Sequence, residues 1–337
     1  MSVPVSIIVP CYNEAGTIEL LLKAIQQQTF ARSAFEVVLA DGMSTDGTRE
    51  AIDRFRQKHP DLTIRLVDNP KRVIPAALNR ALEQARGDVI IRLDAHSIPQ
   101  PDYLERCVGL LAATGAANAG GVWDIRPSGE GWLARAIAVA AAHPLGAGGA
   151  RYRTGGRPGE VDTVPFGAFR REWVERVGRF NERLHTNEDY EFNVRLRKAG
   201  GKIWFDPSIR STYFARGDLA SLGRQYGRYG FWKARMLADH LDTLRWRQAL
   251  PPLFVLSLLI LVILVPFWRA AILLLGVELA VYALALLAAG LQAAIRRRDA
   301  MLFVGLPLAI GTMHVSWGGA FLWGLCRWLT GGSYESR

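Results

Sequence analysis

The first part of the chain alternates between short apolar runs and segments whose apolar residues recur at helical spacing. Runs rich in β-branched residues predict strands at 5–9, 35–40, 62–67 and 89–93. Amphipathic segments predict helices at 17–28, 48–58 and 76–86. Strands that alternate with helices form βαβ units, so we expect an α/β domain with a parallel sheet.

The pattern is less regular in the middle of the chain. Residues 112–159 are rich in Ala and Gly and predict no clear order of elements. Residues 188–198 then predict a helix, with Thr186 as its N-cap and Gly200 and Gly201 as its stop.

From residue 251 onward polar positions become rare. Three segments, 253–267, 270–294 and 301–325, are almost wholly apolar. A membrane span needs about 20 residues, so we expect a transmembrane region at 251–326, with helices near 252–268, 270–294 and 301–325. The first of these segments is short for a membrane span, so the bilayer around it must be thinner or the helix must pack against its neighbours. The alternative is three buried helices of a soluble domain, which uniformly apolar segments disfavour.

Charged and aromatic residues set the expected orientation. Three arginines, 296–298, separate the second and third apolar segments, and Trp317, Trp323 and Trp328 cluster towards the end of the third. Arginines favour the cytoplasmic side and tryptophans the interface, so we expect a multi-pass protein of the inner (plasma) membrane with its N-terminal domain in the cytoplasm. No signal peptide is expected at the N-terminus.

Composition narrows the class of partner. The 337 residues carry a formal net charge of +10 and are 50% hydrophobic, which favours anionic membrane lipids over nucleic acid as the partner. The three cysteines, Cys11, Cys107 and Cys326, form no CxxC pair or zinc spacing. Neither a disulfide framework nor a structural zinc site is therefore expected.

The strand at 89–93 is followed directly by Asp94 and His96. Ligands of open α/β sheets bind beyond the carboxyl ends of such strands. A carboxylate and an imidazole at this point could hold a divalent cation that carries a diphosphate.

Four motifs together resemble family 2 glycosyltransferases, and they occur in that family's order. They are VSIIVPCYNE (5–14), DGMSTDGT (41–48), Asp94-Ala95-His96 and Glu188-Asp189. The chain is most similar to the membrane-attached glucosyltransferases of bacterial exopolysaccharide assembly, of the succinoglycan-biosynthesis type, over about residues 3–235. This resemblance implies a GT-A (Rossmann-like) domain that binds a nucleotide sugar and transfers the sugar with inversion.

The resemblance also implies a role for the first two motifs. Asp41 would contact the nucleobase, and Pro10, Tyr12 and Glu14 would line the base and ribose pocket. The alternative for Asp41, and more so for Asp46, is a carboxylate that only forms a turn.

Asp94 and His96 match the family's metal-binding aspartates, with histidine in place of the second. Asp94 would then also lie in the nucleotide-sugar site. Imidazole suits later transition metals, so Mn²⁺ is the preferred ion and Mg²⁺ stays open. The alternative is that His96 only caps a turn.

The acidic pair Glu188 and Asp189 would supply the chemistry. By resemblance, Asp189 takes the proton from the acceptor hydroxyl and Glu188 orients the site. The alternative is a capping box formed by Thr186 and Asp189, because acids suit the first turn of any helix.

Two further segments complete the candidate site. Gln225 to Tyr229 resembles the family's QxxRW element, in which Arg228 would neutralise phosphate oxygens and Gln225 would lie in the donor site. The alternative is an interfacial helix on anionic lipid. Gly167 matches a glycine that commonly approaches the donor sugar or the acceptor.

We therefore predict a cytosolic GT-A domain at 1–215, interfacial amphipathic helices at 216–250 and the transmembrane region at 251–326. The expected activity is transfer of a hexose, with glucose preferred, from a UDP-sugar to a lipid-linked saccharide in extracellular polysaccharide or glycoconjugate synthesis. One alternative is a polyprenyl-phosphate sugar synthase, in which a lipid phosphate is the nucleophile. A second, of another class, is a non-catalytic membrane scaffold or binding protein.

Overall fold

The computed structural model describes residues 4–331, and the chain divides into two units. The first comprises residues 4–124 and 150–213. The second comprises residues 125–149 and 214–331.

The first unit is built on a mixed β-sheet. The strands are β1 (Val5–Cys11), β2 (Phe35–Asp41), β3 (Ile64–Asp68), β4 (Val89–Arg92), β5 (Ile98–Pro99), β6 (Asn118–Pro127), β7 (Gly159–Val161), β8 (Ala168–Arg170) and β9 (Ile203–Ala215). Their order is β3-β2-β1-β4-β8-β6-β9-β5, and β7 pairs with β9. Strands β3, β2, β1 and β4 are parallel, as predicted, whereas β8 runs antiparallel to β4 and β6.

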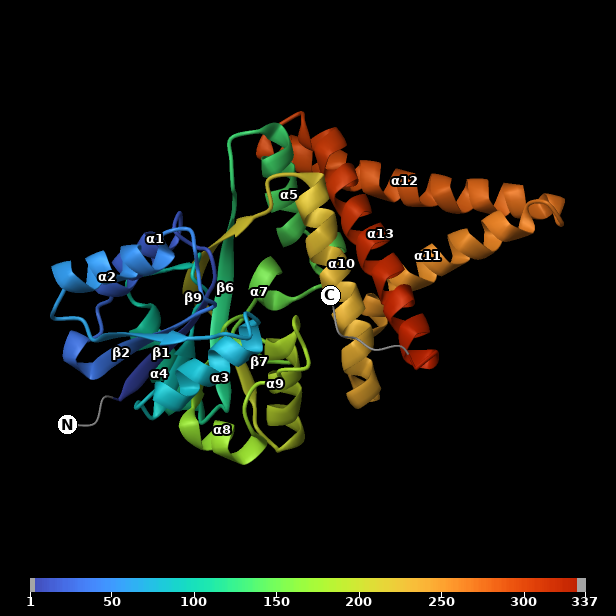
Figure 1. Ribbon diagram of the computed structural model, residues 1–337. Coiled ribbons are helices and arrows are strands. Elements are labelled where there is room, and N and C mark those ends of the chain that lie inside the picture. Colours follow the sequence, from blue (N-terminus) through green and yellow to red (C-terminus); the bar gives the residue numbers. More distant parts are fainter. Residues whose placement is uncertain (1–3, 332–337) are drawn as a thin grey trace. The chain divides into compact units, whose positions relative to one another are not determined.

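Helices cover both faces of this sheet (Figure 1). They are α1 (Ile18–Gln26), α2 (Thr48–Lys58), α3 (Ile74–Gln84), α4 (Tyr103–Thr114), α7 (Arg151–Thr154), α8 (Arg171–Val177) and α9 (Glu188–Lys198). Side chains alternate along β1: Ile7 packs in a core with α1, α2 and α4, and Ile8 packs in a second core with α3 and α9. A strand buried on both faces explains why 5–9 is a continuous apolar run.

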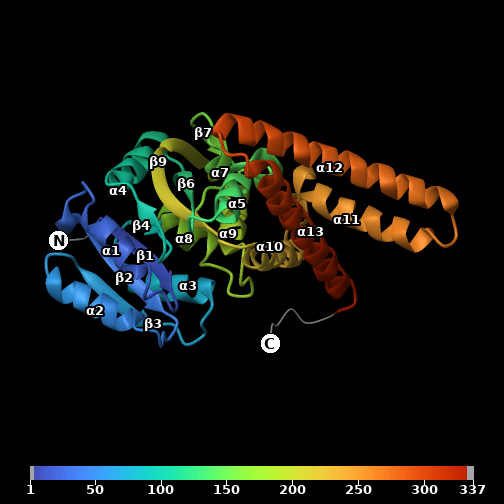
Figure 2. The same cartoon turned by 90° about the horizontal axis from the view of Figure 1, so that it is seen from above.

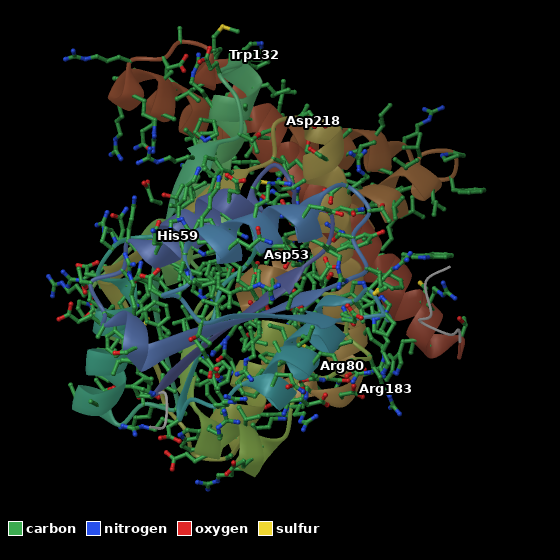
Figure 3. The ribbon with its side chains drawn as sticks, turned by 60° about the vertical axis from the view of Figure 1, so that its left-hand side comes forward. Asp53, His59, Arg80, Trp132, Arg183 and Asp218 are labelled. Carbon is green, nitrogen blue, oxygen red and sulfur yellow. The ribbon has the colours of Figure 1, made fainter. Side chains whose placement is uncertain are left out.

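The second unit is helical. Its helices are α5 (Trp132–Ala142), α6 (Pro144–Ala147), α10 (Leu219–Asp239), α11 (Trp246–Leu264), α12 (Arg269–Arg297) and α13 (Leu302–Leu329). Asp218, labelled in Figure 3, caps α10 by accepting a hydrogen bond from the Ser221 backbone N–H. Helix α13 packs against α5, α10, α11 and α12. Glycine permits the closest of these approaches, because a Cβ at Gly230 would lie 2.1 Å from the carbonyl oxygen of Trp317.

Three helices, α11, α12 and α13, are long and apolar enough to cross a membrane. Helix α11 begins at Trp246 and ends at Leu264, so it starts before the predicted segment and stops short of its end. Prolines 251 and 252 lie inside the helix, beyond its first turn, so each removes a backbone hydrogen bond to the carbonyl oxygen four residues earlier. Helices α11 and α12 run side by side (Figure 2), and Ser257 donates a hydrogen bond of 2.5 Å to Glu278 between them.

Candidate active site

The first two motifs are loops that follow β1 and β2 and are joined by hydrogen bonds. The backbone N–H of Glu14 donates to Thr48 Oγ1 at 2.8 Å, and that of Ala15 donates to Asp46 Oδ2 at 3.1 Å. Asn13 adopts the left-handed conformation (φ 54°), which is uncommon outside glycine. Asp46 therefore has the turn-forming role that the sequence left open.

Asp41 lies at the end of β2 and has no exposed surface. Ser44 donates to both of its carboxylate oxygens, at 2.5 and 2.9 Å, and Arg49 donates to Oδ2 at 3.0 Å. These hydrogen bonds order the loop, and the contact of Asp41 with a nucleobase stays a prediction. Tyr12 is the exposed aromatic residue of these loops, and the Arg72 guanidinium lies 5.9 Å from its ring centre. Pro10 is buried within β1.

Glu14 contacts His96, which the sequence did not anticipate. Its Oε1 lies 3.1 Å from His96 Nδ1, and its Oε2 accepts a hydrogen bond from Thr17. A carboxylate at Nδ1 orients the imidazole, as carboxylates commonly do beside metal-binding histidines. The predicted place of Glu14 in a base and ribose pocket stays a prediction.

Asp94 follows β4, where the Ser97 N–H and hydroxyl close a turn onto its carbonyl oxygen at 2.9 and 2.7 Å. Its Oδ1 accepts hydrogen bonds from Arg92. A carboxylate oxygen of Asp94 and a ring nitrogen of His96 are donor types that could hold a divalent cation. Within residues 4–331, no group of three or more His, Cys, Asp or Glu side chains is placed to hold a metal ion.

Arg92 connects two of the predicted motifs and was missed from the sequence. Its Nη2 lies 3.2 Å from Asp94 Oδ1 and 2.9 Å from Glu188 Oε1. The side chains of Arg92 and Glu188 are both almost fully buried. Burial works to lower the pKa of Arg92, but Asp94, Glu188 and Asp189 outweigh it and raise that pKa above its usual value. The sequence did contain a signal for this role, because Arg92 is a charged residue at the end of a strand that is otherwise apolar and predicted to be buried.

Helix α9 begins with the acidic pair. Its N-cap is Asn187 in the left-handed conformation (φ 69°), without a side-chain cap, so the predicted Thr186 N-cap and capping box are wrong. Burial raises the pKa of Glu188 to about 7, with Asp189 adding to the rise and Arg92 opposing it. Asp189 is only half-buried, and its Oδ1 accepts a hydrogen bond from the Tyr190 N–H. Of the two acids, Asp189 is the one that an external hydroxyl can reach.

Gly167 lies next to the cluster formed by Arg92, Asp94 and Glu188, and the backbone at this position requires a glycine. Its φ is 89°, a Cβ there would lie 2.5 Å from Asn118 Oδ1, and its carbonyl oxygen accepts the Arg92 N–H at 3.0 Å. Phe166 before it also has a positive φ of 58°, which is strained for a bulky residue. These contacts explain the glycine without a contact to a sugar, which stays a prediction.

Gln225 and Arg228 lie on α10 in the second unit. Gln225 is buried and donates to the Tyr229 hydroxyl at 3.1 Å. Arg228 is exposed one turn of helix from Arg224, so α10 presents cations on one face.

Comparison with known proteins decides the family. The model of glycosyl transferase family 2 matches residues 6–178. The succinoglycan biosynthesis protein ExoA of Rhizobium meliloti (strain 1021) is 35% identical over 321 residues, which are 94% of this chain and 93% of that protein. The chain is a family 2 glycosyltransferase. It acts in polysaccharide or glycoconjugate synthesis.

A further relative and two solved structures are also similar to this chain. One relative is the dolichyl N-acetyl-alpha-D-glucosaminyl phosphate 3-beta-D-2,3-diacetamido-2,3-dideoxy-beta-D-glucuronosyltransferase of Methanococcus voltae. It is 27% identical to this chain, and the match covers 96% of this chain and 97% of that protein. Among solved structures, a Pyrobaculum calidifontis mannosyltransferase in complex with GDP-Man and Mn²⁺ matches with a TM-score of 0.59 and 24% identity, over 92% of this chain and 86% of that one. S. aureus TarS 1-349 matches with a TM-score of 0.53 and 18% identity, over 98% and 93%. The predicted GT-A fold is confirmed.

Proposed function

We propose that this glycosyltransferase transfers glucose from UDP-glucose, with inversion, to a lipid-linked saccharide. The observation that carries the proposal is the Arg92 side chain, which holds Asp94 and Glu188 on one nitrogen. The motif expected at the diphosphate and the motif expected to supply the base are thereby joined in one buried cluster. The similarity to a succinoglycan biosynthesis protein supports a carbohydrate acceptor.

In the proposed reaction, Asp189 accepts the proton of the acceptor hydroxyl as the oxygen attacks the anomeric carbon of the donor. The bond from that carbon to the diphosphate oxygen breaks, and UDP leaves with the electron pair. One displacement inverts the carbon, so an α-linked donor gives a β-linked product. Glu188 is a positioning residue, because its carboxylate is turned to Arg92 and holds the start of α9 in place.

Asp94 and His96 would hold a divalent cation, Mn²⁺ or Mg²⁺, with Glu14 orienting the imidazole. When bound, this ion would neutralise negative charge on the leaving diphosphate. Arg228 and Gln225 of α10 are proposed to contribute to diphosphate binding as well.

The nucleoside is proposed to bind at the loops after β1 and β2. Tyr12 offers an exposed ring on which a base can stack, and Pro10 and Asp41 shape the loops beneath it. Gly167 is proposed to lie beside the donor sugar.

We further propose the same division as the sequence suggested: a cytoplasmic domain at 1–215, interfacial helices at 216–250 and a region crossing the inner membrane at 251–326. The exposed apolar side chains of α11 and α12 support the last part, because water would not tolerate so large an apolar surface. Arginines 296–298, between α12 and α13, would lie on the cytoplasmic side.

The test is a transfer assay in membranes that contain the protein. Labelled UDP-glucose is supplied with polyprenyl-diphosphate saccharides and Mn²⁺ or Mg²⁺, and NMR reads the anomeric configuration of the product. A β-linked glycolipid that Asp189→Asn fails to form supports the proposal, with Asp102→Asn as the control because Asp102 is also a carboxylate at a helix start. Transfer to a simple polyprenyl phosphate with full activity in Asp189→Asn would instead establish a polyprenyl-phosphate sugar synthase.

A further inference from the structure

An aromatic cluster in the first unit has no part in the mechanism above. Its centre is Trp123 on β6, and Tyr213 of β9 is stacked on it with ring centres 4.3 Å apart and an angle of 7°. Tyr152 of α7 meets it edge-on at 5.0 Å, and Phe166 lies 5.6 Å away. The cluster holds the indole in one fixed orientation.

The indole N–H is the unusual feature of this cluster. Trp123 Nε1 is buried and finds no hydrogen-bond partner within residues 4–331. Buried N–H groups are nearly always paired, and this one can only donate. The missing partner is therefore an acceptor oxygen that a ligand can bring.

A cation also lies over the indole ring. The Arg153 guanidinium lies over the Trp123 ring at 5.1 Å and over Tyr152 at 5.5 Å. Arg153 belongs to α7, a single helical turn between Gly149 (φ 74°) and Gly155 (φ 77°). Glycines at both ends let this turn change its backbone angles at little cost, so Arg153 can leave the ring.

The cluster adjoins the catalytic carboxylates through the backbone. Phe166 precedes Gly167, whose carbonyl oxygen accepts the Arg92 N–H. Tyr213 follows Thr212, which pairs with Ile98 at the end of the loop that carries His96. These connections reach Arg92 and the loop that carries His96, two parts of the proposed site.

We propose that Trp123 is the platform for the acceptor sugar. The apolar C–H face of a pyranose packs on the indole in place of the Arg153 guanidinium, and a sugar hydroxyl accepts the Nε1 hydrogen. This inference rests on the proposed function and names the acceptor subsite.

The test compares Trp123→Phe with Trp173→Phe in the full-length enzyme. Trp173 on α8 is the matched control, because it also carries a guanidinium over its ring, that of Arg176 at 5.0 Å. The probes are polyprenyl-diphosphate-linked glucose, galactose and N-acetylglucosamine, with UDP-glucose as donor. Loss of the N–H should raise the KM for the acceptor about 5-fold in Trp123→Phe alone. The KM for UDP-glucose and the UDP released without acceptor should stay unchanged.

Arg153→Gln gives a second measurement that leaves the aromatic packing intact. Uncovering the ring should lower the acceptor KM, whereas Arg176→Gln should leave it unchanged. An unchanged acceptor KM in both Trp123→Phe and Arg153→Gln would overturn the proposal. A wild-type enzyme that neither transfers from UDP-glucose nor releases UDP from it would contradict the proposed function instead, so the two failures are distinct.

Discussion

Replacing Arg92 by methionine should damage both the stability and the charge balance of the site. Methionine keeps much of the volume but leaves Glu188 buried without its cation, which lies 2.9 Å away in the native protein. Removing one partner of a buried ion pair costs about 3–5 kcal/mol. For a domain of roughly 150–250 residues, this corresponds to a fall in Tm of roughly 6–20 °C.

The loss of stability in Arg92→Met should also depend on pH, and the pKa of Glu188 determines whether it grows or shrinks as the pH rises. Its pKa of about 7 lies above the usual 4.5, so the proton favours the folded state. The stability that this group contributes is complete below the unfolded pKa and is lost as the pH rises through 7. Removing Arg92 raises the pKa further, so Arg92→Met should lose more stability at about pH 8.5 than at about pH 6.

The assay is thermal unfolding of the full-length protein in detergent, followed by tryptophan fluorescence at both pH values. Arg106→Met is the control, because Arg106 forms an exposed ion pair with Asp102 that is worth about 0.2–1 kcal/mol. If Arg92→Met unfolds at the same temperature as Arg106→Met, with no dependence on pH, then Arg92 does not organise the site as described.

Substitutions at four further positions have defined outcomes. Asp189→Asn should lower kcat by about 10²–10⁴-fold with unchanged donor binding, and a wild-type rate would exclude Asp189 as the base. His96→Asp should keep its activity and shift its metal preference towards Mg²⁺, whereas His96→Ala should lose most of its metal dependence. If Mn²⁺ activates His96→Ala as strongly as the wild type, His96 is not a metal ligand. Gly230→Ala should cost about 1–3 kcal/mol by forcing α10 away from Trp317, as a lower Tm would show. Gly276→Ala should be silent, because no atom lies within 4 Å of its Cβ position.

The sequence predicted the four parallel strands, β1 to β4, and the order of the motifs, because local patterns determine both. A short apolar run such as 5–9 strongly favours a buried strand. Asp94 comes just after a second run of this kind, at 89–93. Partners far apart in the chain were not predictable in this way. Glu14 and His96 are 82 residues apart, and Asp41 is held by an arginine whose pattern is that of an exposed helix face.

The sequence by itself determined an α/β domain, three helices apolar enough for a membrane and the four motifs of a family 2 glycosyltransferase. Periodicity and composition suffice for these, because each depends on neighbours in the chain. Only the tertiary structure decided that Arg92 joins Asp94 to Glu188 and that Asn187, not Thr186, begins α9. It also placed Tyr213 against Trp123. A buried charge and a stacked ring derive their roles from groups brought close by folding, and no local pattern records which groups those are.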